Sequence, residues 1–536
     1  MMNKNFFKNS SFLNISILLF LLAVGAFLLF YNLNHYYLWS DEGETACYAR
    51  NILKFGLPYG FDGRNAFFLN KSLLPILEPW FVLYAAALSL KLFGDNGIRI
   101  LFAFLGLAAM FMQYVFVCRF YNNKKLALIN LLLIVTCVQY LLFARQCRYY
   151  SMVMLLAPAI GYFYMSYKDR WWEIILAALL FTIFFFSNYI IAVAFLFSLA
   201  LSLFLFDNRS KAVSFFLKPL PIIAVICGCF FYWLYQNGWM DANPYLLRNI
   251  HPANFLQMIW LYFKDYNLLQ LLPFSIIISL VVVWIWEAWL QKKAFLETNR
   301  KTLSLLFFII LYTVVISILS TAPVQDNHAG IRYATAIFPS LLLIQAVFVE
   351  KLYNLRKWAA YILLFVLIFT NLFTFLPMRS YLFEFVRENS RPFDNPAKVA
   401  VNFLETKTRQ DDLIYIAQPL MIGSMEFYLG DKLLFCAIAD VKDENLIPET
   451  IRQKQYIYSQ NVVPQWIVFF GSLVKPENKR FLEKIKLADY QIHFLPVFGF
   501  DLTRPEIYWR SFIPINKFSP ENSLYILERN KDKSRD

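Results

Sequence analysis

The chain has 536 residues, of which 59% are hydrophobic, 19% aromatic and only 16% charged, and its formal net charge is +14. Its apolar residues occur in long runs, which excludes a soluble globular enzyme and is typical of an integral membrane protein. The basic excess would suit nucleic acid, but the basic residues lie mostly in short loops between apolar runs. There they act as topology signals, so no nucleic-acid partner is expected.

The first apolar run, residues 11–31, has about the length needed to cross a hydrocarbon core. Lys4 and Lys8 precede it and predict a cytoplasmic N-terminus. A cleaved signal peptide is not expected, because the run is too long and no small-residue cleavage site follows it. The chain should then emerge outside the membrane at Asp41 and Glu42.

The next apolar run, residues 74–93, is ambiguous, because it contains Glu78 and Pro79 near its start and Lys91 near its end. If it crosses, the basic loop 119–125 falls outside; if it lies flat in the outer interface, every basic loop falls inside. The flat interpretation is preferred, and the resulting odd number of spans leaves the C-terminus outside. About eleven spans are predicted, near residues 11–31, 98–118, 126–144, 152–167, 172–187, 189–206, 213–235, 267–290, 303–320, 333–349 and 358–377.

From about residue 391 charges become frequent, and short β-type runs alternate with helical ones. The expected fold is therefore a mainly α, polytopic membrane protein with a small extracytoplasmic α/β domain. The membrane domain covers residues 1–385 and includes a first outer loop, 32–97, with interfacial helices; the α/β domain covers 391–536. Strands are predicted at 412–417, 433–438, 465–470, 490–498 and 523–528, and helices at 396–407 and 476–486.

Three carboxylates follow the first span in the stretch WSDEGET. Asp41 and Glu44 have the spacing of a capping box for a helix that stops at Gly56 and Pro58. Capping does not use Glu42, and it can coexist with catalysis. In the catalytic interpretation, one of these carboxylates is a general base that takes a proton from an acceptor hydroxyl, and a second carboxylate beside it raises its basicity.

Arginines gather on the same predicted side of the membrane. Arg145 and Arg148, three residues apart, are expected to share a helix face at the outer end of the third span. Snorkelling is the alternative, but outer arginines run against the charge bias of the chain, so an anion site is preferred. The plainer explanations are a helix-end anchor for Arg332, a solvated face for Arg64 and Lys71, and an aromatic belt for the tyrosines. The further candidate substrate-binding residues are Arg64, Lys71, Glu78, Tyr149, His328, Arg332 and Tyr333.

Metal and disulfide chemistry are not indicated. Four histidines without HxxxH spacing predict no zinc centre, and seven cysteines without a CxxC pair predict no disulfide framework. The sequence identifies no cofactor with certainty, and a divalent cation is possible but not indicated. A lipid-linked phosphate would suit both the arginines, which would bind it, and the carboxylate, which would activate the attacking group.

Four segments resemble the GT-C glycosyltransferases, in the branch that contains lipid A aminoarabinose transferases and protein O-mannosyltransferases. They are WSDEGETACYARNILKFG (39–56), EPWFVLYAAALSLKLFGDNGIR (78–99), RFYNNKKLALINLLL (119–133) and GIRYATAIFPSLLLI (330–344). The resemblance covers nearly the whole chain in plan and is sharpest over residues 36–151. Where the aminoarabinose transferases tend to have Glu-Lys-Pro, this chain has Glu78-Pro79, and Lys71 or Arg64 is the candidate replacement.

The resemblance implies transfer of a hexosyl or pentosyl group from a polyprenyl-phosphate donor to a lipid, glycan or protein acceptor. The reaction would take place on the outer face of the cytoplasmic (inner) membrane, among membrane lipids, with Asp41 as the base and Glu42 as its neighbour. The alternative is a transporter or flippase for a lipid-linked or anionic substrate, which would have broken helices and charges within its spans. Only 16 glycines and spans almost free of charge favour the enzyme.

Overall fold

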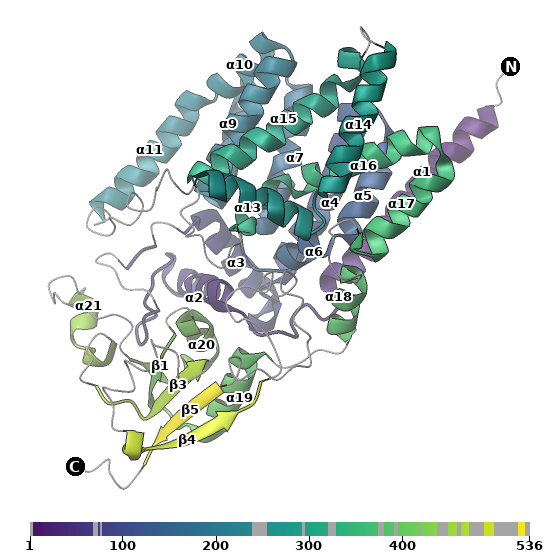
Figure 1. The fold of residues 1–536 in the computed structure, drawn as a ribbon. Coiled ribbons are helices and arrows are strands. Elements are labelled where there is room, and N and C mark those ends of the chain that lie inside the picture. Colours follow the sequence, from purple (N-terminus) through teal and green to yellow (C-terminus); the bar gives the residue numbers. More distant parts are fainter. Residues whose placement is uncertain are drawn as a thin grey trace. The chain divides into compact units, whose positions relative to one another are not determined.

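The computed structural model describes residues 4–67, 73–75, 78–237, 255–291, 295–319, 329–372, 380–390, 395–418, 421–436, 449–457, 462–470, 487–497 and 524–530. The chain forms two compact units (Figure 1). Unit one comprises residues 1–31, 102–232 and 244–389, and unit two comprises 32–101, 233–243 and 390–536. Each unit is therefore built from segments that are far apart in the sequence.

Unit one consists of apolar helices. Within the described ranges, six are long and apolar enough to cross a membrane, or seven if α5 and α6 count as one span bent by 68°. The chain is thus a multi-pass membrane protein. The helices, some of which extend slightly past the unit's limits, are α1 (Lys4–Phe30), α4 (Ile100–Tyr121), α5 (Lys124–Thr136), α6 (Val138–Ala144), α7 (Tyr150–Ser166), α8 (Trp171–Ser187), α9 (Tyr189–Phe206), α10 (Arg209–Leu217), α11 (Leu220–Gln236), α13 (Phe255–Leu268), α14 (Phe274–Gln291), α15 (Phe295–Leu319), η4 (Ile331–Ile337), α16 (Phe338–Leu355), α17 (Lys357–Phe369) and α18 (Tyr381–Ser390).

Every span predicted from the sequence has an apolar helix at its position, but α7, α8, α14 and α17 fall short of a full crossing by length. Several predicted spans have different limits, and three of them show why. The span expected at 126–144 breaks at Cys137, whose backbone is extended. The one expected at 267–290 starts at Phe274, because Gln270 has a left-handed φ of 56° and Pro273 cannot continue a helix. The one expected at 333–349 starts as the 3-10 helix η4, and Pro339 opens α16.

Small residues and buried polar pairs hold the helices of unit one together. A Cβ at Gly106 would lie 2.7 Å from the Cβ of Ala144, so α4 and α6 approach at van der Waals distance. The Tyr140 hydroxyl donates to the Gly106 carbonyl (2.8 Å), and the Gln113 amide donates to Asn130 (3.2 Å). Close backbone approach and interhelical hydrogen bonds are what associate helices in lipid, where the hydrophobic effect between helices is weak.

Unit two has a five-stranded sheet in the order β2-β1-β3-β5-β4. β1 pairs in parallel with β2 and β3, and β5 pairs antiparallel with β3 and β4. All five strands lie where the sequence predicts them, and helix α19 has the predicted limits. The elements are α19 (Pro396–Lys407), β1 (Leu413–Ile416), α20 (Ile422–Leu429), β2 (Leu434–Phe435), α21 (Glu449–Arg452), η8 (Gln455–Ile457), β3 (Trp466–Phe470), η9 (Leu487–Asp489), β4 (Tyr490–Leu495) and β5 (Leu524–Arg529). The helix expected at 476–486 lies outside the described residues.

The first outer loop belongs to the same unit as this sheet. It contains α2 (Ser40–Phe55), α3 (Trp80–Phe93) and η1 (Asp95–Gly97). Asn65 donates to the carbonyls of Gly430 and Leu433 and accepts from the Phe435 N–H, with all three distances between 2.9 and 3.0 Å. These bonds use both the nitrogen and the oxygen of one buried amide, so the loop docks on the edge of the sheet through a specific contact.

Helix α3 is the segment whose crossing was ambiguous in the sequence. It has 14 residues, which is about 21 Å of helix, less than the roughly 30 Å of a hydrocarbon core. Its length thus favours the interfacial interpretation, which stays a prediction.

Candidate functional site

Helix α2 presents the acidic stretch at its N-terminus. The N-cap is Trp39, with extended backbone and no side-chain cap, and Asp41 and Glu42 lie in the first turn. The predicted capping box is therefore wrong, because the helix begins at Ser40 and takes Asp41 inside it. First-turn carboxylates interact favourably with the positive end of the helix dipole. The predicted stop at Gly56 is confirmed, since Gly56 adopts a left-handed φ of 78° and its N–H donates to the Ile52 carbonyl.

Glu42 is bound by a buried arginine, Arg99. Arg99 Nε donates to Glu42 Oε1 (2.9 Å) and Arg99 Nη2 to Glu42 Oε2 (2.5 Å), a two-pronged ion pair whose side chains are 8% and 0% exposed. Arg99 Nη1 also donates to the carbonyls of Tyr36 (2.6 Å) and Leu33 (3.3 Å). One guanidinium thus ties the chain leaving the first span to the first turn of α2, and it compensates the negative charge of Glu42.

Asp41, the neighbour of Glu42, is half-buried. Arg99 offsets the charge of Glu42, the carboxylate next to Asp41 in the sequence. The place of Asp41 in the first helical turn is set by Glu42 on one side and by the Thr45 hydroxyl, which donates to the Asp41 carbonyl (2.9 Å), on the other. The Asp41 backbone therefore lies in a helical turn that is held by these contacts.

Sequence reasoning missed Arg99. A signal was present, because Arg99 directly precedes an apolar run on the predicted outer side of the membrane. Basic residues of this chain lie mostly in the predicted cytoplasmic loops, and a basic residue on the outer side is the exception that also identified Arg145 and Arg148. Arg99 also lies within a segment that carries the family resemblance, at the end of residues 78–99.

Glycines let α2 pack directly on α20 of the α/β segment. A Cβ at Gly43 would lie 2.4 Å from the backbone of Ser424, and one at Gly423 would lie 2.7 Å from the Glu44 nitrogen. Near this crossing the Tyr428 hydroxyl accepts from the Leu38 N–H (3.0 Å). A side chain at either glycine would push the helices apart, so Gly43 in the stretch WSDEGET is explained by this contact.

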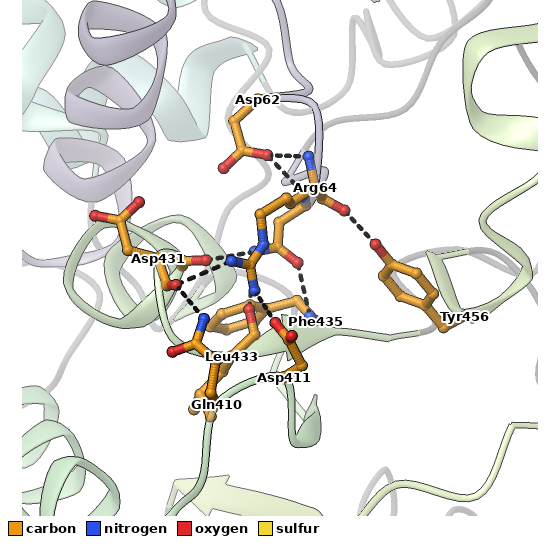
Figure 2. Close-up of polar contacts among 10 residues, drawn as sticks. Asp62, Arg64, Gln410, Asp411, Asp431, Leu433, Phe435 and Tyr456 are labelled. Carbon is orange, nitrogen blue, oxygen red and sulfur yellow. Dashed lines mark hydrogen bonds and ion pairs between the residues drawn. The ribbon is translucent and has the colours of Figure 1, made fainter.

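The remaining candidates of the first loop are only partly described. Arg64 pairs with Asp411 (2.5 Å), donates to the Asp431 carbonyl (3.0 Å), and its own carbonyl accepts from Tyr456 (2.6 Å) (Figure 2). Arg64 thus has a visible role in docking the loop, and its assignment to substrate stays a prediction. Glu78 is half-buried, just before the N-cap of α3. Lys71 lies outside the described residues.

In unit one, two predicted basic segments come together. Arg148 lies 5.9 Å from the Tyr149 ring, and Arg332 lies 5.2 Å from the Tyr333 ring. The Tyr149 hydroxyl is within electrostatic range of both arginines. Arg148 is buried, with 7% of its surface exposed, whereas Arg332 is half-buried. This group of Arg148, Tyr149, Arg332 and Tyr333 is called the arginine–tyrosine cluster below, and it unites segments far apart in the sequence.

Arg145 is placed differently. Its Nη1 donates to the carbonyls of Leu28 (2.8 Å) and Tyr31 (3.0 Å), and its Nη2 donates to Asn389 (3.1 Å). The expectation that Arg145 and Arg148 share a helix face is wrong, because α6 ends at Ala144 and α7 begins only at Tyr150. Arg145 therefore caps the last carbonyls of α1, a structural contact that accounts for its burial.

Two residues of α13 hold the cluster in place, and sequence reasoning did not single out the first of them, Asp265. Asp265 of α13, fully buried, accepts from the Ala329 N–H (2.9 Å), and Tyr262 donates to the Gly330 carbonyl (3.3 Å). These contacts position the start of η4, which carries Arg332. The sequence signal that could have identified Asp265 is the position of a carboxylate within the amphipathic segment 255–268. His328 lies outside the described residues.

No group of three or more His, Cys, Asp or Glu suited to hold a metal ion occurs among the residues that the structure describes.

Comparisons with known proteins give a fold assignment. No family model and no curated protein sequence matches the chain. Solved structures do match, and they define the class: the chain has the GT-C type of fold that the sequence segments resemble.

The particular match is ArnT, a lipid A aminoarabinose transferase, from Cupriavidus metallidurans. Its structures bound to undecaprenyl phosphate and in the apo state each align with a TM-score of 0.56 and 13% identity, over 95% of this chain and 97% of ArnT. The oligosaccharyltransferase AglB from Archaeoglobus fulgidus, in complex with an inhibitory peptide and a dolichol-phosphate, aligns with a TM-score of 0.47 and 10% identity, over 98% of this chain and 75% of AglB. The ArnT match confirms the predicted fold.

The Arg99–Glu42 pair predicts a large stability effect. Arg99→Ala would leave the Glu42 carboxylate buried without a cation, which costs about 3 to 5 kcal/mol. Arg99→Lys keeps the charge but loses the two-pronged geometry, so an intermediate loss is expected. Glu42→Gln combined with Arg99→Gln should recover part of the loss. Thermal unfolding in detergent measures each step.

Lys218→Ala is the control for that series, because the Lys218–Asp169 ion pair is 48% and 42% exposed and its loss should leave the unfolding temperature almost unchanged. The interpretation of Arg99 as the clamp of α2 fails if Arg99→Ala is no more destabilising than Lys218→Ala.

Glu426 of α20 predicts a pH effect. Its carboxyl is buried and no described donor reaches its Oε2. Burial raises the pKa of Glu426 well above its usual range, the charge of Asp62 raises the pKa further, and Arg50 offsets part of this shift. The folded protein therefore holds a proton that the unfolded chain releases at lower pH. Its stability should fall as pH rises from the usual glutamate range through the raised pKa.

Glu426→Gln removes this proton exchange. It should raise the unfolding temperature at pH 8 while changing it little at pH 4.5, and the measurement is thermal unfolding across that range. An equal shift at both pH values would show that the carboxyl is ionised in the folded protein.

Proposed function

We propose that the chain is a glycosyltransferase that moves a sugar from a polyprenyl-phosphate donor to an acceptor, with Asp41 as the general base. The observation that carries this proposal is the acidic first turn of α2, built by a buried ion pair directly after the first membrane helix. It occurs in a chain with the fold of ArnT, a protein solved with undecaprenyl phosphate bound. The donor class is transferred from that fold and from the sequence resemblance.

The Asp41 carboxylate would accept the proton of the acceptor group. The acceptor oxygen or nitrogen attacks the anomeric carbon of the sugar, a new glycosidic bond forms, and the bond between that carbon and the phosphate oxygen breaks. The electron pair of the broken bond leaves with the polyprenyl phosphate, and the acceptor proton passes to Asp41. General base catalysis of this kind contributes typically 10² to 10⁴ in rate.

The arginine–tyrosine cluster would bind the donor phosphate. Guanidinium groups form charge-assisted hydrogen bonds to phosphate oxygens, and burial of Arg148 strengthens such bonds by lowering the local dielectric constant. The negative charge on the bridging oxygen grows as the sugar departs, so cations there stabilise the transition state more than the bound donor. Tyr149 and Tyr333 add phenol groups that can hydrogen-bond the phosphate or pack against the sugar.

The membrane location follows the charge bias of the loops. Basic loops inside predict a cytoplasmic N-terminus, with α2 and the C-terminal α/β segment on the outer face of the cytoplasmic (inner) membrane. A donor with a long prenyl chain reaches a membrane-embedded enzyme from the lipid phase. The acceptor is proposed as a lipid, glycan or protein exposed at that surface, and the transferred group as a hexose or pentose.

Asp41→Asn should reduce sugar transfer by at least a hundredfold, because the amide cannot accept the acceptor proton. Binding of undecaprenyl phosphate should stay unchanged, since the base contacts the acceptor. Mass spectrometry of lipids and surface glycoconjugates, in cells lacking the gene and complemented with wild type or variant, measures the transfer. Restoration of the missing sugar mass by Asp41→Asn would remove Asp41 as the base.

Arg148→Gln and Arg332→Gln, unlike Asp41→Asn, should weaken the binding of undecaprenyl phosphate, and we expect a loss of at least tenfold. Native mass spectrometry or a fluorescence titration of the purified chain measures that affinity. Arg170→Gln is the matched control, since Arg170 lies in the basic loop before α8. Unchanged affinity in both cluster variants would show that these arginines do not bind the phosphate and have a structural role instead.

A further inference from the structure

Unit one contains a cavity of about 400 Å³ that the glycosyl transfer does not use. Its walls come from α4, α7, α9 and α15, and Ala336 and Pro339, where η4 passes into α16, also line it. All of these residues belong to unit one. A volume of this size is typical of a small-molecule or lipid site.

The charged residues of the cavity lie at the helix ends. Its lining includes Arg119, near the end of α4, Arg300 and Lys301, in the early turns of α15, and one carboxylate, Asp207. All four side chains are exposed. Asp207 accepts from the Tyr164 hydroxyl (2.9 Å), and no described carboxylate pairs with the three cations. The mouth of the cavity is therefore positively charged.

These cations are oriented yet keep donors for a ligand. Arg300 Nε donates to the Phe206 carbonyl (2.7 Å), and Lys301 Nζ donates to the Phe120 carbonyl (2.5 Å). A guanidinium has five N–H donors and an ammonium three, so most of them remain for an anion. Backbone carbonyls of α9 and α4 thus hold both groups at the cavity mouth.

The deeper lining is apolar and aromatic. Phe116, Phe195 and Phe308 line it together with Leu199 and Pro158. Gln113 lies six residues before Arg119, or about 9 Å along α4, and Phe195 lies twelve residues before Asp207, or about 18 Å along α9. The cavity therefore runs from a cationic mouth into the apolar interior of the helix bundle.

We propose that this cavity binds an anionic phospholipid, with the headgroup phosphate on Arg119, Arg300 and Lys301 and one acyl chain in the aromatic channel. The three cations complement a phosphate, and the apolar depth complements a hydrocarbon chain, which a soluble anion would leave unfilled. Basic pockets between membrane helices bind anionic headgroups by this combination.

The site is separate from the arginine–tyrosine cluster. Tyr149 precedes the first residue of α7, whereas Tyr164 and Met165 of the cavity lie near its last residue. Fifteen residues of helix separate Tyr149 from Tyr164, about 22 Å. The bound lipid would thus act on the stability of the bundle, independently of the donor phosphate.

The test measures lipid binding to the purified full chain in neutral detergent by native mass spectrometry, with thermal unfolding as a second readout. The probes are phosphatidylglycerol, phosphatidylcholine with the same acyl chains, and sn-glycerol 3-phosphate. The charge variant is Arg119→Gln, Arg300→Gln and Lys301→Gln together, which removes the three charges and keeps polar side chains at the mouth. The matched control is Lys168→Gln, Arg170→Gln and Lys218→Gln, which removes three charges outside the cavity.

A third variant, Leu199→Trp, fills the channel without changing the charge. The expected result is one tightly bound phosphatidylglycerol, at least tenfold weaker binding in the charge variant and in Leu199→Trp, and unchanged binding in the control. Equal loss in the charge variant and the control would mean general attraction to the basic surface. Equal binding of phosphatidylcholine, or full competition by sn-glycerol 3-phosphate, would also overturn the proposal. If Leu199→Trp does not fold, the charge variant, whose three substituted residues are exposed, is sufficient to test the proposal.

Discussion

The ion pair between Arg99 and Glu42 is the contact on which the proposed chemistry depends. Both side chains are almost fully buried, and the guanidinium also binds carbonyls of residues 33 and 36. A buried pair of this kind adds little net stability compared with apolar residues, but it is costly to break. Its effect is therefore to specify one geometry, in which Asp41 stands in the first turn of a helix whose position relative to the preceding chain is set.

The sheet of unit two contributes to the same geometry. α2 packs on α20 through glycines, and Asn65 and Arg64 dock the first loop on residues near β1 and β2. The α/β segment is thus a scaffold for the loop that carries Asp41, the proposed base, which explains why residues 32–101 and 390–536 belong to one compact unit. In unit one, α13 does the same for η4, because Asp265 and Tyr262 hold the backbone that leads to Arg332.

Local pattern predicted the elements well and their tertiary roles poorly. The five strands, α19 and the stop of α2 at Gly56 follow from periodicity and turn chemistry, which act over a few residues. The capping box prediction failed because the helix begins at Ser40, before the cap position that local spacing assigned to Asp41. Arg145 and Arg148 looked equivalent in the sequence, yet one caps α1 and the other joins Arg332. Such partners cannot be deduced from spacing alone.

The central claim is that the acidic start of α2 lies on the outer membrane surface, where a lipid-linked sugar is presented. Labelling with a membrane-impermeant maleimide tests it most directly. The labelled position is Leu53→Cys, an exposed residue of α2, in a chain whose native cysteines are replaced. In sealed right-side-out vesicles this cysteine should react without permeabilisation, whereas a cysteine at Lys168 should react only after it. Labelling of position 53 only in permeabilised vesicles would place Asp41 on the inner side and contradict the account.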